Sequence, residues 1–484
     1  MTRRELWICG AVAMTLLASR FITMTLLPMS DTTEPRYAEI ARLMLESGDW
    51  ITPWLEPGIP FWGKPPLSFW LQALSMRLLG VGDFAARLPA WIAVLGTLVL
   101  AGKLASHLGG ARLATRTVLI LATMALTWVA AGAVMTDAFL AFGTTLGVVS
   151  YLLAADGKRQ PWGWLFFIGI SIGLLSKGPL ALVLTGAPIL AWSLWNLRWR
   201  SPLPALPWLG GSALTAVLVL PWYIAAELKT PGFLNYFIVG EHFGRFVVPG
   251  WEGDLYGNAH DEPRGMIWAF LLWASFPWGL IGGAMLLRAL TRGPGREALR
   301  AWLTEPAHGL LLAAALTTPL FFSLAGNTLW TYLLPSLPFV ALLIAIRLQT
   351  APLPRLIALA ALVPAIVTAL GVHLSMQPET LKSEAALVAA FMQHRGDTQQ
   401  TLHYAGDLPH SARYYARNQV RRIALEDISR VAASAPDGPL FVAVRNADMA
   451  QLTGTPVPAF EPLFRGRSHT LLRIDRNRTP PFQR

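Results

Sequence analysis

Long apolar runs separated by short polar segments make up the first three quarters of the chain. A run of roughly 17–25 apolar residues is long enough to cross a bilayer as a helix. The pattern predicts about eleven to thirteen transmembrane helices, with one short run, Trp162–Ile172, in the series. The runs are Leu6–Leu27, Leu88–His107, Ala114–Val134, Ala138–Ala155, Trp162–Ile172, Pro179–Leu197, Leu206–Ala226, Gly265–Leu287, Gly309–Ala325, Trp330–Ile346 and Leu356–Leu374.

Two amphipathic helices are predicted directly after the first apolar run. The first is Glu34–Ser47 and the second begins at Pro65 and ends near Leu79, with proline in its first turn. Between them lies a loop, Asp49–Lys64, rich in Trp, Pro and Gly. Such helices beside a membrane span indicate a site at the lipid–water boundary. The first helix carries Tyr37, Ile40, Ala41, Met44 and Leu45 on one face and Glu39, Arg42 and Glu46 on the other.

After about Met376 the chain has the composition of a soluble segment. Short strands and helices alternate there, which predicts a compact α/β domain of roughly 100 residues. The expected fold is therefore an all-α polytopic membrane protein over residues 1–375, with large loops at 28–85 and 227–265, and a small α/β domain over residues 376–484. The expected strands are Thr401–Ala405, Leu440–Val444 and Leu471–Ile474, and the expected helices are Ser383–His394 and Ser411–Asn418.

Composition supports a membrane protein. The chain is 54% hydrophobic and 14% charged, whereas a soluble domain has about 25% charged residues. The net charge of +11 does not indicate nucleic-acid binding, because the basic residues are spread over short loops and form no basic face. Cys9 is the single cysteine, which rules out a disulfide within the chain and a cysteine-based metal site. The N-terminal run is interpreted as a retained signal anchor.

The basic residues also predict an orientation. Lys and Arg gather in alternate loops, and the positive-inside rule places those loops in the cytoplasm. The N-terminus is then cytoplasmic, and the Asp31–Trp70 stretch, the Glu227–Arg264 loop and the C-terminal domain face outward. The basic set is Arg3, Arg4, Lys103, Arg112, Arg116, Lys158, Arg159, Arg198, Arg200, Arg288, Arg292, Arg296, Arg300, Arg347 and Arg355.

Asp31 and Glu34 are the first candidates for chemistry. Two carboxylates beside Arg36 can act as general base and electrostatic stabiliser, or hold a metal ion. They can equally well cap the helix that begins near Pro35, since Asp is a good N-cap residue and acids are favoured at a helix N-terminus. Both interpretations stay open at this point.

Lys64, Asp137 and Lys177 are the next candidates, each in an outward segment. Lys64 lies at the start of the second amphipathic helix, where a cation and backbone donors suit a phosphate. A lysine that merely snorkels to the interface is the simpler interpretation. Asp137 lies in an outward turn between spans, where it is either a simple exposed acid or, because an acid at the edge of two spans is costly, a functional residue. Lys177 is the cation of another outward turn and suits a lipid phosphate.

The loop that follows residue 235 combines acids, histidines and aromatic residues. Glu241, His242 and His260 are of types that bind metal ions, although their spacing is not diagnostic, so a divalent cofactor is an open possibility. Arg245 is the stronger candidate because a guanidinium binds phosphate with two hydrogen bonds. The stretch from Asn327 to Pro335 opens a span at an outward turn and either packs there or forms a wall of a cavity.

Several of these motifs together resemble a known family. Glu34-Pro35-Arg36-Tyr37, Lys64-Pro65-Pro66-Leu67 and Met135-Thr136-Asp137 come in the order seen in bacterial phospholipid-carrier-dependent glycosyltransferases of the GT-C superfamily. This group includes the lipid A aminoarabinose transferases and the protein O-mannosyltransferases. Later motifs agree as far as about residue 350, and they are Ser176-Lys177-Gly178-Pro179, Glu241-His242-Phe243, Arg245-Phe246 and Thr331-Tyr332-Leu333-Leu334-Pro335.

The resemblance implies an enzyme of the bacterial inner membrane that transfers a sugar, with inversion, from an undecaprenyl-phosphate donor to a lipid A-like or other acceptor. An acid of the first outward loop would be the base. Arg36, Tyr37, Lys64, Lys177 and Arg245 would hold the donor phosphate. The family has adjacent Asp and Glu, whereas Thr33 precedes Glu34 here, so the identity of the base stays open among Asp31, Glu34 and Asp137. Gly63 stands where the family often has Glu, which removes a possible metal ligand.

Three other functions remain as alternatives. A protein O-glycosyltransferase of the same fold would use a protein acceptor. A flippase for lipid-linked sugars would place charges in the middle of its spans, whereas the charges here gather in the outward loops. A binding protein without activity would keep the cavity and lack a base.

Overall fold

The computed structural model describes residues 3–157, 159–195, 206–257, 260, 262–303, 305–395, 400–434, 439–452 and 460–475. It divides into two compact units. The first contains Met1–Met24 and Met44–Thr368, and the second contains Thr25–Leu43 and Ala369–Arg484. Each unit is described separately. Lys158, Arg198 and Arg200, three members of the basic set, lie outside the described residues.

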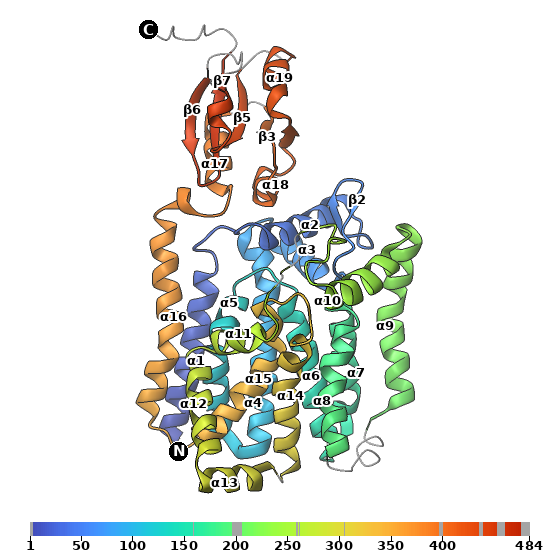
Figure 1. Cartoon of the computed structure of the whole chain (residues 1–484), viewed down its shortest axis with the longest axis vertical. Coiled ribbons are helices and arrows are strands. Elements are labelled where there is room, and N and C mark those ends of the chain that lie inside the picture. Colours follow the sequence, from blue (N-terminus) through green and yellow to red (C-terminus); the bar gives the residue numbers. More distant parts are fainter. Residues whose placement is uncertain are drawn as a thin grey trace. The chain divides into compact units, whose positions relative to one another are not determined.

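The first unit is a bundle of apolar helices (Figure 1). Every predicted apolar run coincides with at least one of them, because a backbone in lipid must satisfy its own hydrogen bonds. The helices are α1 (Arg3–Thr23), α3 (Leu67–Leu79), α4 (Asp83–Ala122), α5 (Ala125–Ala130), α6 (Asp137–Ala155), α7 (Arg159–Lys177), α8 (Leu180–Trp195), α9 (Trp208–Lys229), η2 (Asn235–Gly244), α10 (Arg245–Val247), α11 (Met266–Ala274), α12 (Trp278–Thr291), α13 (Gly293–Leu303), α14 (Pro306–Phe322), η3 (Trp330–Ser336), α15 (Leu337–Arg347) and α16 (Leu353–Ser375), whose last turns belong to the second unit.

Among the described residues, five helical segments are long and apolar enough to cross a membrane, or six if the bent pair α11 and α12 counts as one span. Three shorter apolar helices, Gly10–Thr23, Leu180–Trp195 and Ala307–Phe322, fall below that length. α7 is longer than the short run predicted at Trp162–Ile172. α13 lies across one end of the bundle, between α12 and α14 (Figure 1).

Two predicted spans are broken. The run Ala114–Val134 ends as a helix at Ala122, and the short α5 follows at Ala125. The break inside α4 at Gly109 and Gly110 instead agrees with the sequence, because it lies between the runs predicted at Leu88–His107 and Ala114–Val134. Gly110 has φ 73°, a left-handed conformation that glycine adopts without strain. The run Gly265–Leu287 bends by 117° between α11 and α12 at Pro277. Proline disfavours helical geometry at the residue before it, so the helix stops there.

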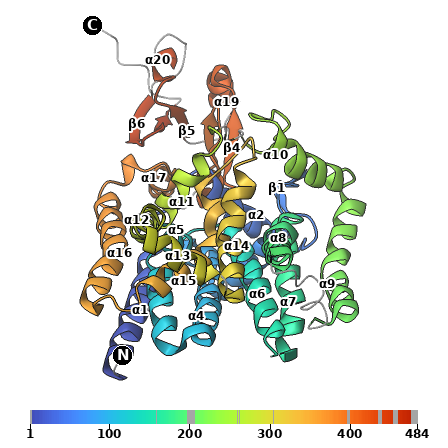
Figure 2. The same ribbon diagram turned by 60° about the horizontal axis from the view of Figure 1, so that its bottom comes forward.

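α6 and α7 pack at the shortest distance their backbones allow. A Cβ atom on Gly169 would lie 2.6 Å from the Gly143 carbonyl oxygen and 2.7 Å from the Gly147 nitrogen. Small residues let membrane helices approach in this way. Figure 2 shows α7 between α6 and α9, and this packing sets the positions of the residues at the ends of both helices.

The second unit combines the C-terminal α/β domain with the residues that follow α1. Its sheet, as far as the described residues show, has the order β4-β3-β5-β7-β6, with β4, β3 and β5 parallel. The three predicted strands are confirmed, and the edge strands β4 and β6 are additional. Its elements are α2 (Thr33–Ser47, shared with the first unit), η4 (Pro378–Thr380), α17 (Ala385–Arg395), β3 (Leu402–Ala405), α18 (His410–Ala416), β4 (Val420–Ile423), η5 (Leu425–Asp427), α19 (Ile428–Ser434), β5 (Leu440–Arg445), α20 (Met449–Leu452), β6 (Phe460–Arg465) and β7 (His469–Ile474).

The polar face predicted for the first amphipathic helix is partly wrong. Glu39 and Arg42 are buried, not solvated, and Arg42 donates to both oxygens of Glu39 at 2.7 and 2.6 Å. Arg42 also donates to the Asn418 side chain at 3.0 Å. The pair packs inside the second unit, because two matched charges that satisfy each other can be buried where a single one cannot. The helix itself, predicted from Glu34, begins at Thr33 as α2.

Candidate active site

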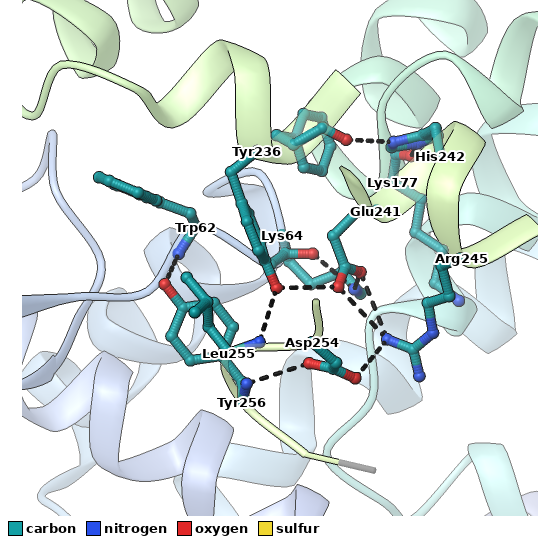
Figure 3. A network of polar contacts seen from close by, with 12 residues as sticks. Trp62, Lys64, Lys177, Tyr236, Glu241, His242, Arg245, Asp254, Leu255 and Tyr256 are labelled. Atoms are coloured by element: carbon teal, nitrogen blue, oxygen red, sulfur yellow. Dashed lines mark hydrogen bonds and ion pairs between the residues drawn. The ribbon is translucent and has the colours of Figure 1, made fainter. Parts of the chain in front are cut away.

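Glu241 lies at the centre of a cluster of charged and aromatic side chains in the first unit (Figure 3). Its carboxylate accepts from Lys64 Nζ at 3.1 Å, from Arg245 Nη1 at 3.4 Å and from the Tyr236 hydroxyl at 3.3 Å. Arg245 Nη1 also lies 3.2 Å from Asp254 Oδ2. Two cations are thus held by two carboxylates. We call Lys64, Tyr236, Glu241, Arg245 and Asp254 the Glu241 cluster.

Burial divides the Glu241 cluster into an inner and an outer layer. The side chains of Glu241 and Asp254 are 5% and 6% exposed, whereas those of Lys64 and Arg245 are each 19% exposed. The acids therefore lie behind the cations. Burial by itself would raise the pKa of Glu241, but Lys64 and Arg245 more than offset it and hold that pKa below its ordinary value. An anion that reaches this site meets Lys64 and Arg245 first.

Local structure explains why these residues meet. Lys64 follows a short hairpin, β1 (Trp54–Glu56) and β2 (Ile59–Pro60), and precedes α3. Glu241 and Tyr236 lie in η2, a π-helix, and Arg245 begins α10 directly after it. π-helical turns are frequently found at functional sites.

Two tyrosines join the η2 segment to the Lys64 loop. The Tyr256 hydroxyl donates to the Pro60 carbonyl at 2.8 Å and accepts from the Trp62 backbone at 3.0 Å. Tyr236 accepts from the Leu255 backbone at 3.2 Å. Burial raises the pKa of Tyr256 to about 12 and raises that of Tyr236, so both hydroxyls keep their protons. They are fixed donors that hold the cluster in shape.

The loop before Lys64 is held to α9 by Asp49. Its carboxylate accepts from Lys229 Nζ at 2.6 Å, from the Trp54 indole at 2.8 Å, and from the backbone of Ile51 and Thr52. Burial opposes the charge, yet these donors outweigh it and lower the pKa of Asp49. The loop rich in Trp, Pro and Gly is therefore ordered, which places Lys64.

Asp137 and Lys177, both predicted as site residues, are brought together. Asp137 is the first residue of α6 and Lys177 the last of α7, and Lys177 Nζ lies 2.7 Å from Asp137 Oδ1. Lys177 Nζ also lies 4.7 Å from the centroid of the Tyr332 ring, a cation–π contact. Both charged side chains are about nine-tenths buried, so the pair neutralises itself.

His242 connects this pair to the Glu241 cluster. Its Nδ1 lies 2.7 Å from the Phe237 carbonyl oxygen and its Nε2 lies 3.0 Å from the Lys177 carbonyl oxygen. Both ring nitrogens are thus engaged by the backbone, so His242 links η2 to the end of α7. Burial lowers its pKa, against the effect of the two carbonyl groups.

The residues predicted as metal ligands do not form a ligand set. His260 is exposed, and its carbonyl oxygen accepts from the Thr328 backbone. Within the described part of the chain, no group of three or more His, Cys, Asp or Glu side chains is arranged to hold a metal ion. Glu241 and His242 are neighbours in sequence, but each has the hydrogen-bond partners described above.

Asp31, Glu34, Arg36 and Tyr37 lie in the second unit. The Asp31 carboxylate accepts from the Ser411 backbone at 2.9 Å and from the Ser411 hydroxyl. Burial raises the pKa of Asp31, although the Ser411 donors act in the opposite direction. Glu34 lies in the first turn of α2 and accepts weakly from the Ser30 backbone at 3.5 Å.

The other two candidates of this stretch contact each other. Arg36 Cζ lies 5.4 Å from the centroid of the Tyr37 ring, and the Tyr37 side chain is buried. Tyr37 is therefore part of the core of α2. Asp31 is held by a residue distant in sequence, and Glu34 lies in the first turn of α2, where an acid is favoured at a helix N-terminus.

Comparison with known proteins identifies the fold. A family model described as dolichyl-phosphate-mannose-protein mannosyltransferase matches residues 10–237, just under half of the chain. The crystal structure of ArnT from Cupriavidus metallidurans bound to undecaprenyl phosphate superposes with a TM-score of 0.80, covers 100% of both chains and is 17% identical. The chain has the GT-C fold. The predicted fold class, a helical membrane protein with a small C-terminal α/β domain, is thereby confirmed.

Sequence relatives agree with the resemblance. The GT-C chain is 32% identical over 319 residues to an undecaprenyl phosphate-alpha-4-amino-4-deoxy-L-arabinose arabinosyl transferase of Edwardsiella ictaluri, covering 64% of this chain and 54% of the relative. A protein of the same description from Pseudomonas aeruginosa is 30% identical, covering 71% and 59%. The chain thus spans somewhat more than half the length of the curated relatives it matches. The predicted resemblance is confirmed, and the GT-C chain is a multi-pass membrane protein.

Sequence reasoning missed three residues of this region. Asp254 and Tyr236 belong to the Glu241 cluster and Tyr256 contacts the Lys64 loop, and no local pattern indicated these roles. Asn327, which begins the stretch predicted to pack at a turn or to form a wall of a cavity, donates to the carbonyl oxygens of Arg245 at 2.6 Å and Val248 at 2.9 Å and so packs there. A signal was present, because polar residues are dense in a loop that follows a membrane span, but their partners are far away in sequence.

Proposed function

We propose that this protein transfers a sugar from an undecaprenyl-phosphate carrier to a lipid A-like acceptor of the bacterial envelope. The single observation that carries the proposal is the pair of cations, Lys64 and Arg245, in front of two buried acids. The GT-C fold supports it, and so do the relatives, which are described as undecaprenyl phosphate-alpha-4-amino-4-deoxy-L-arabinose arabinosyl transferases, and the ArnT structure, which is bound to undecaprenyl phosphate.

Lys64 and Arg245 bind the donor phosphate in this proposal. Transfer breaks the bond between the anomeric carbon and the phosphate oxygen, so negative charge develops on the leaving lipid phosphate. Cations held in place before the reaction stabilise that charge without reorganisation. The Glu241 cluster supplies this preorganisation, because each cation is fixed by a carboxylate. Lys177, held by Asp137, is a further cation of the same unit.

Asp31 acts as the general base. It takes the proton of the acceptor hydroxyl, whose oxygen then attacks the anomeric carbon from the face opposite to the phosphate, with inversion. Burial raises the pKa of Asp31, which makes it a stronger proton acceptor than an exposed carboxylate. Asp137 is a weaker candidate because its charge is neutralised by Lys177.

The orientation proposed for the chain has the N-terminus in the cytoplasm of a bacterial inner membrane. The basic loops support it by the positive-inside rule. The Glu241 cluster and the C-terminal domain, taken as residues 376–484, then face the periplasm. An undecaprenyl carrier keeps its tail in the bilayer and its phosphate at the interface, where such a site has access to it.

The experiment is mass spectrometry of lipid A and other envelope lipids from a strain without this gene, complemented with the wild type, Asp31→Asn or Lys64→Ala. We expect one envelope component of the strain without the gene to lose the mass of one sugar, and only the wild-type gene to restore it. The size of the lost mass identifies the sugar, and the component that loses it identifies the acceptor. An unchanged set of glycoforms together with accumulation of a lipid-linked sugar would overturn the proposal in favour of a transporter.

A protein acceptor is the second candidate. The match to a protein mannosyltransferase family model over residues 10–237 favours it. The same strains distinguish the two, because envelope glycoproteins would then lose the sugar mass while lipid A stays unchanged.

A further inference from the structure

We infer that Ser411, at the start of α18 in the C-terminal domain, is a positioning residue that orients the carboxylate of Asp31. The inference rests on the proposed function, in which Asp31 is the base. Both residues belong to the second unit, and Ser411 comes from the C-terminal domain.

Ser411 contacts both oxygens of one carboxylate. Its backbone N–H donates to Asp31 Oδ1 at 2.9 Å and its hydroxyl donates to Asp31 Oδ2. Two donors from one residue fix the plane of the carboxylate as well as its position. Each oxygen keeps a second lone pair, so the carboxylate can still accept a proton.

The direction of the Ser411 hydroxyl is itself determined. Its oxygen accepts from the Glu384 backbone N–H at 2.9 Å, so its proton points to Asp31. The Ser411 side chain is fully buried. The backbone of Asp31 is held as well, because its N–H donates to the Lys382 carbonyl oxygen at 2.8 Å.

Glu384, whose backbone orients Ser411, is anchored in turn. Its carboxylate accepts from the Tyr404 hydroxyl on β3 at 2.9 Å and lies 3.0 Å from Nδ1 of His469 on β7. All three side chains are buried. The chain of contacts therefore runs from two strands of the sheet through Glu384 and Ser411 to Asp31, so the position of Asp31 is tied to the sheet.

Three charged or titratable groups act on Asp31 in this unit. Glu384 and Tyr404 belong to the network, and Lys382 is the nearby cation; burial and Glu384 raise the pKa of Tyr404, so its hydroxyl stays protonated. A hydrogen bond to the charged form favours that form. The Ser411 hydroxyl therefore keeps Asp31 ionised down to a lower pH than burial alone would allow.

The test compares Ser411→Ala, Ser411→Thr and Asp31→Asn in the purified full-length protein. The probes are lipid A and undecaprenyl phosphate-alpha-4-amino-4-deoxy-L-arabinose, the donor in the relatives' description. We expect Ser411→Ala to lower kcat about tenfold and to shift the acid limb of the pH–rate profile upward by about one unit, the size of a lost hydrogen bond to a charge. The donor KM should change little, and Ser411→Thr should restore most of kcat.

Thr380→Ala is the matched control. It removes an exposed hydroxyl bonded to the Gln377 carbonyl oxygen.

A second measurement does not depend on activity. Infrared difference spectra between the wild type and Asp31→Asn report the titration of the Asp31 carboxyl, which should move upward in Ser411→Ala. The inference would be overturned if the titration of the Asp31 carboxyl did not move in Ser411→Ala. It would also be overturned if Ser411→Ala and Ser411→Thr lost the same activity and both had lower thermal stability. Full activity in Asp31→Asn would instead overturn the proposed role of Asp31, a result distinct from failure of the Ser411 variants.

Discussion

Lys177 Nζ lies 2.7 Å from Asp137 Oδ1, and the two residues stand at the facing ends of α6 and α7. Each was predicted separately as a site residue, and the structure makes them one buried pair. A buried pair is neutral as a unit, but either charge without its partner is costly. The relationship therefore assigns the two residues a shared structural role in addition to any contact with substrate.

Removing one partner of this pair should be worse than removing both charges. We expect Asp137→Asn or Lys177→Met to lower the free energy of unfolding by about 3 kcal/mol, while the double variant recovers much of that loss. Thermal unfolding in detergent measures the stability of the three variants and the wild type. If Lys177 also contacts the donor phosphate, the double variant stays inactive although it is stable. A double variant no more stable than the single ones would contradict the structural role of the pair.

Glu241→Gln should strengthen binding of a free phosphate carrier. The substitution keeps an acceptor for Lys64 and Arg245 but removes the negative charge that neutralises them. The pKa of Glu241 is held below its ordinary value by Lys64 and Arg245, so its charge is fully present at neutral pH and is lost only as the pH falls through the lowered pKa. We expect the Kd for undecaprenyl phosphate at pH 7 to fall about tenfold, with a steeper salt dependence.

The matched control for this charge change is Glu252→Gln. Glu252 is exposed in the same loop, so the substitution alters the net charge equally without touching the Glu241 cluster. Calorimetric titration with the carrier measures both variants. Weaker binding in Glu241→Gln would mean that Glu241 serves chiefly to orient the two cations.

Gly169→Ala should separate α6 from α7. The added Cβ would lie 2.6 Å from the Gly143 carbonyl oxygen, and backbone atoms cannot move aside as a side chain can. We expect a loss of about 2 kcal/mol, because overpacking costs more than the gain in helix propensity. Activity should fall with it, since Asp137 and Lys177 lie at the ends of these helices.

Gly186→Ala in α8 is the corresponding control. A Cβ there meets nothing within 4 Å, so the variant should be as stable as the wild type or slightly more stable. Thermal unfolding of Gly169→Ala and Gly186→Ala compares their stability with that of the wild type. Equal stability of Gly169→Ala and Gly186→Ala would refute the close helix packing.

His410 should make the second unit sensitive to acid. Burial, together with the charges of Arg36 and Arg413, lowers the pKa of His410 to about 4. An unfolded histidine binds its proton near pH 6.5, so between that pH and about 4 only the unfolded state is protonated. Stability of this unit is therefore lost as the pH falls through that window, by about 1–2 kcal/mol after allowance for its partial exposure.

His410→Gln should remove this dependence. We expect the difference in Tm between pH 7 and pH 5 to shrink in His410→Gln and to remain in His394→Gln, which changes an exposed histidine of the same unit. Differential scanning calorimetry of the full-length protein measures this difference in Tm. A pH dependence equal in both variants would assign the acid sensitivity to other groups.

Local patterns in the sequence were sufficient to predict most of the helices and the central strands. The apolar runs, the helices α2 and α3 and the central strands of the C-terminal sheet follow from hydrophobic periodicity, which acts between residues a few positions apart. The break between α4 and α5, inside the run Ala114–Val134, and the break between α11 and α12 were not anticipated, because each lies within one continuous apolar run. The edge strand β4 was missed because its exposed arginines lack the alternation of a half-buried strand.

The sequence by itself determined that this is a polytopic membrane protein with acids and cations gathered in two loops between its spans and with motifs in the order of a GT-C family. Only the tertiary structure decided which charges meet. Lys64 pairs with Glu241 across 177 positions, and Asp31 is held by Ser411 across 380. The physical reason is that a helix is stabilised by its near neighbours, whereas a buried charge finds its partner only when the packing of distant helices and strands brings the two together.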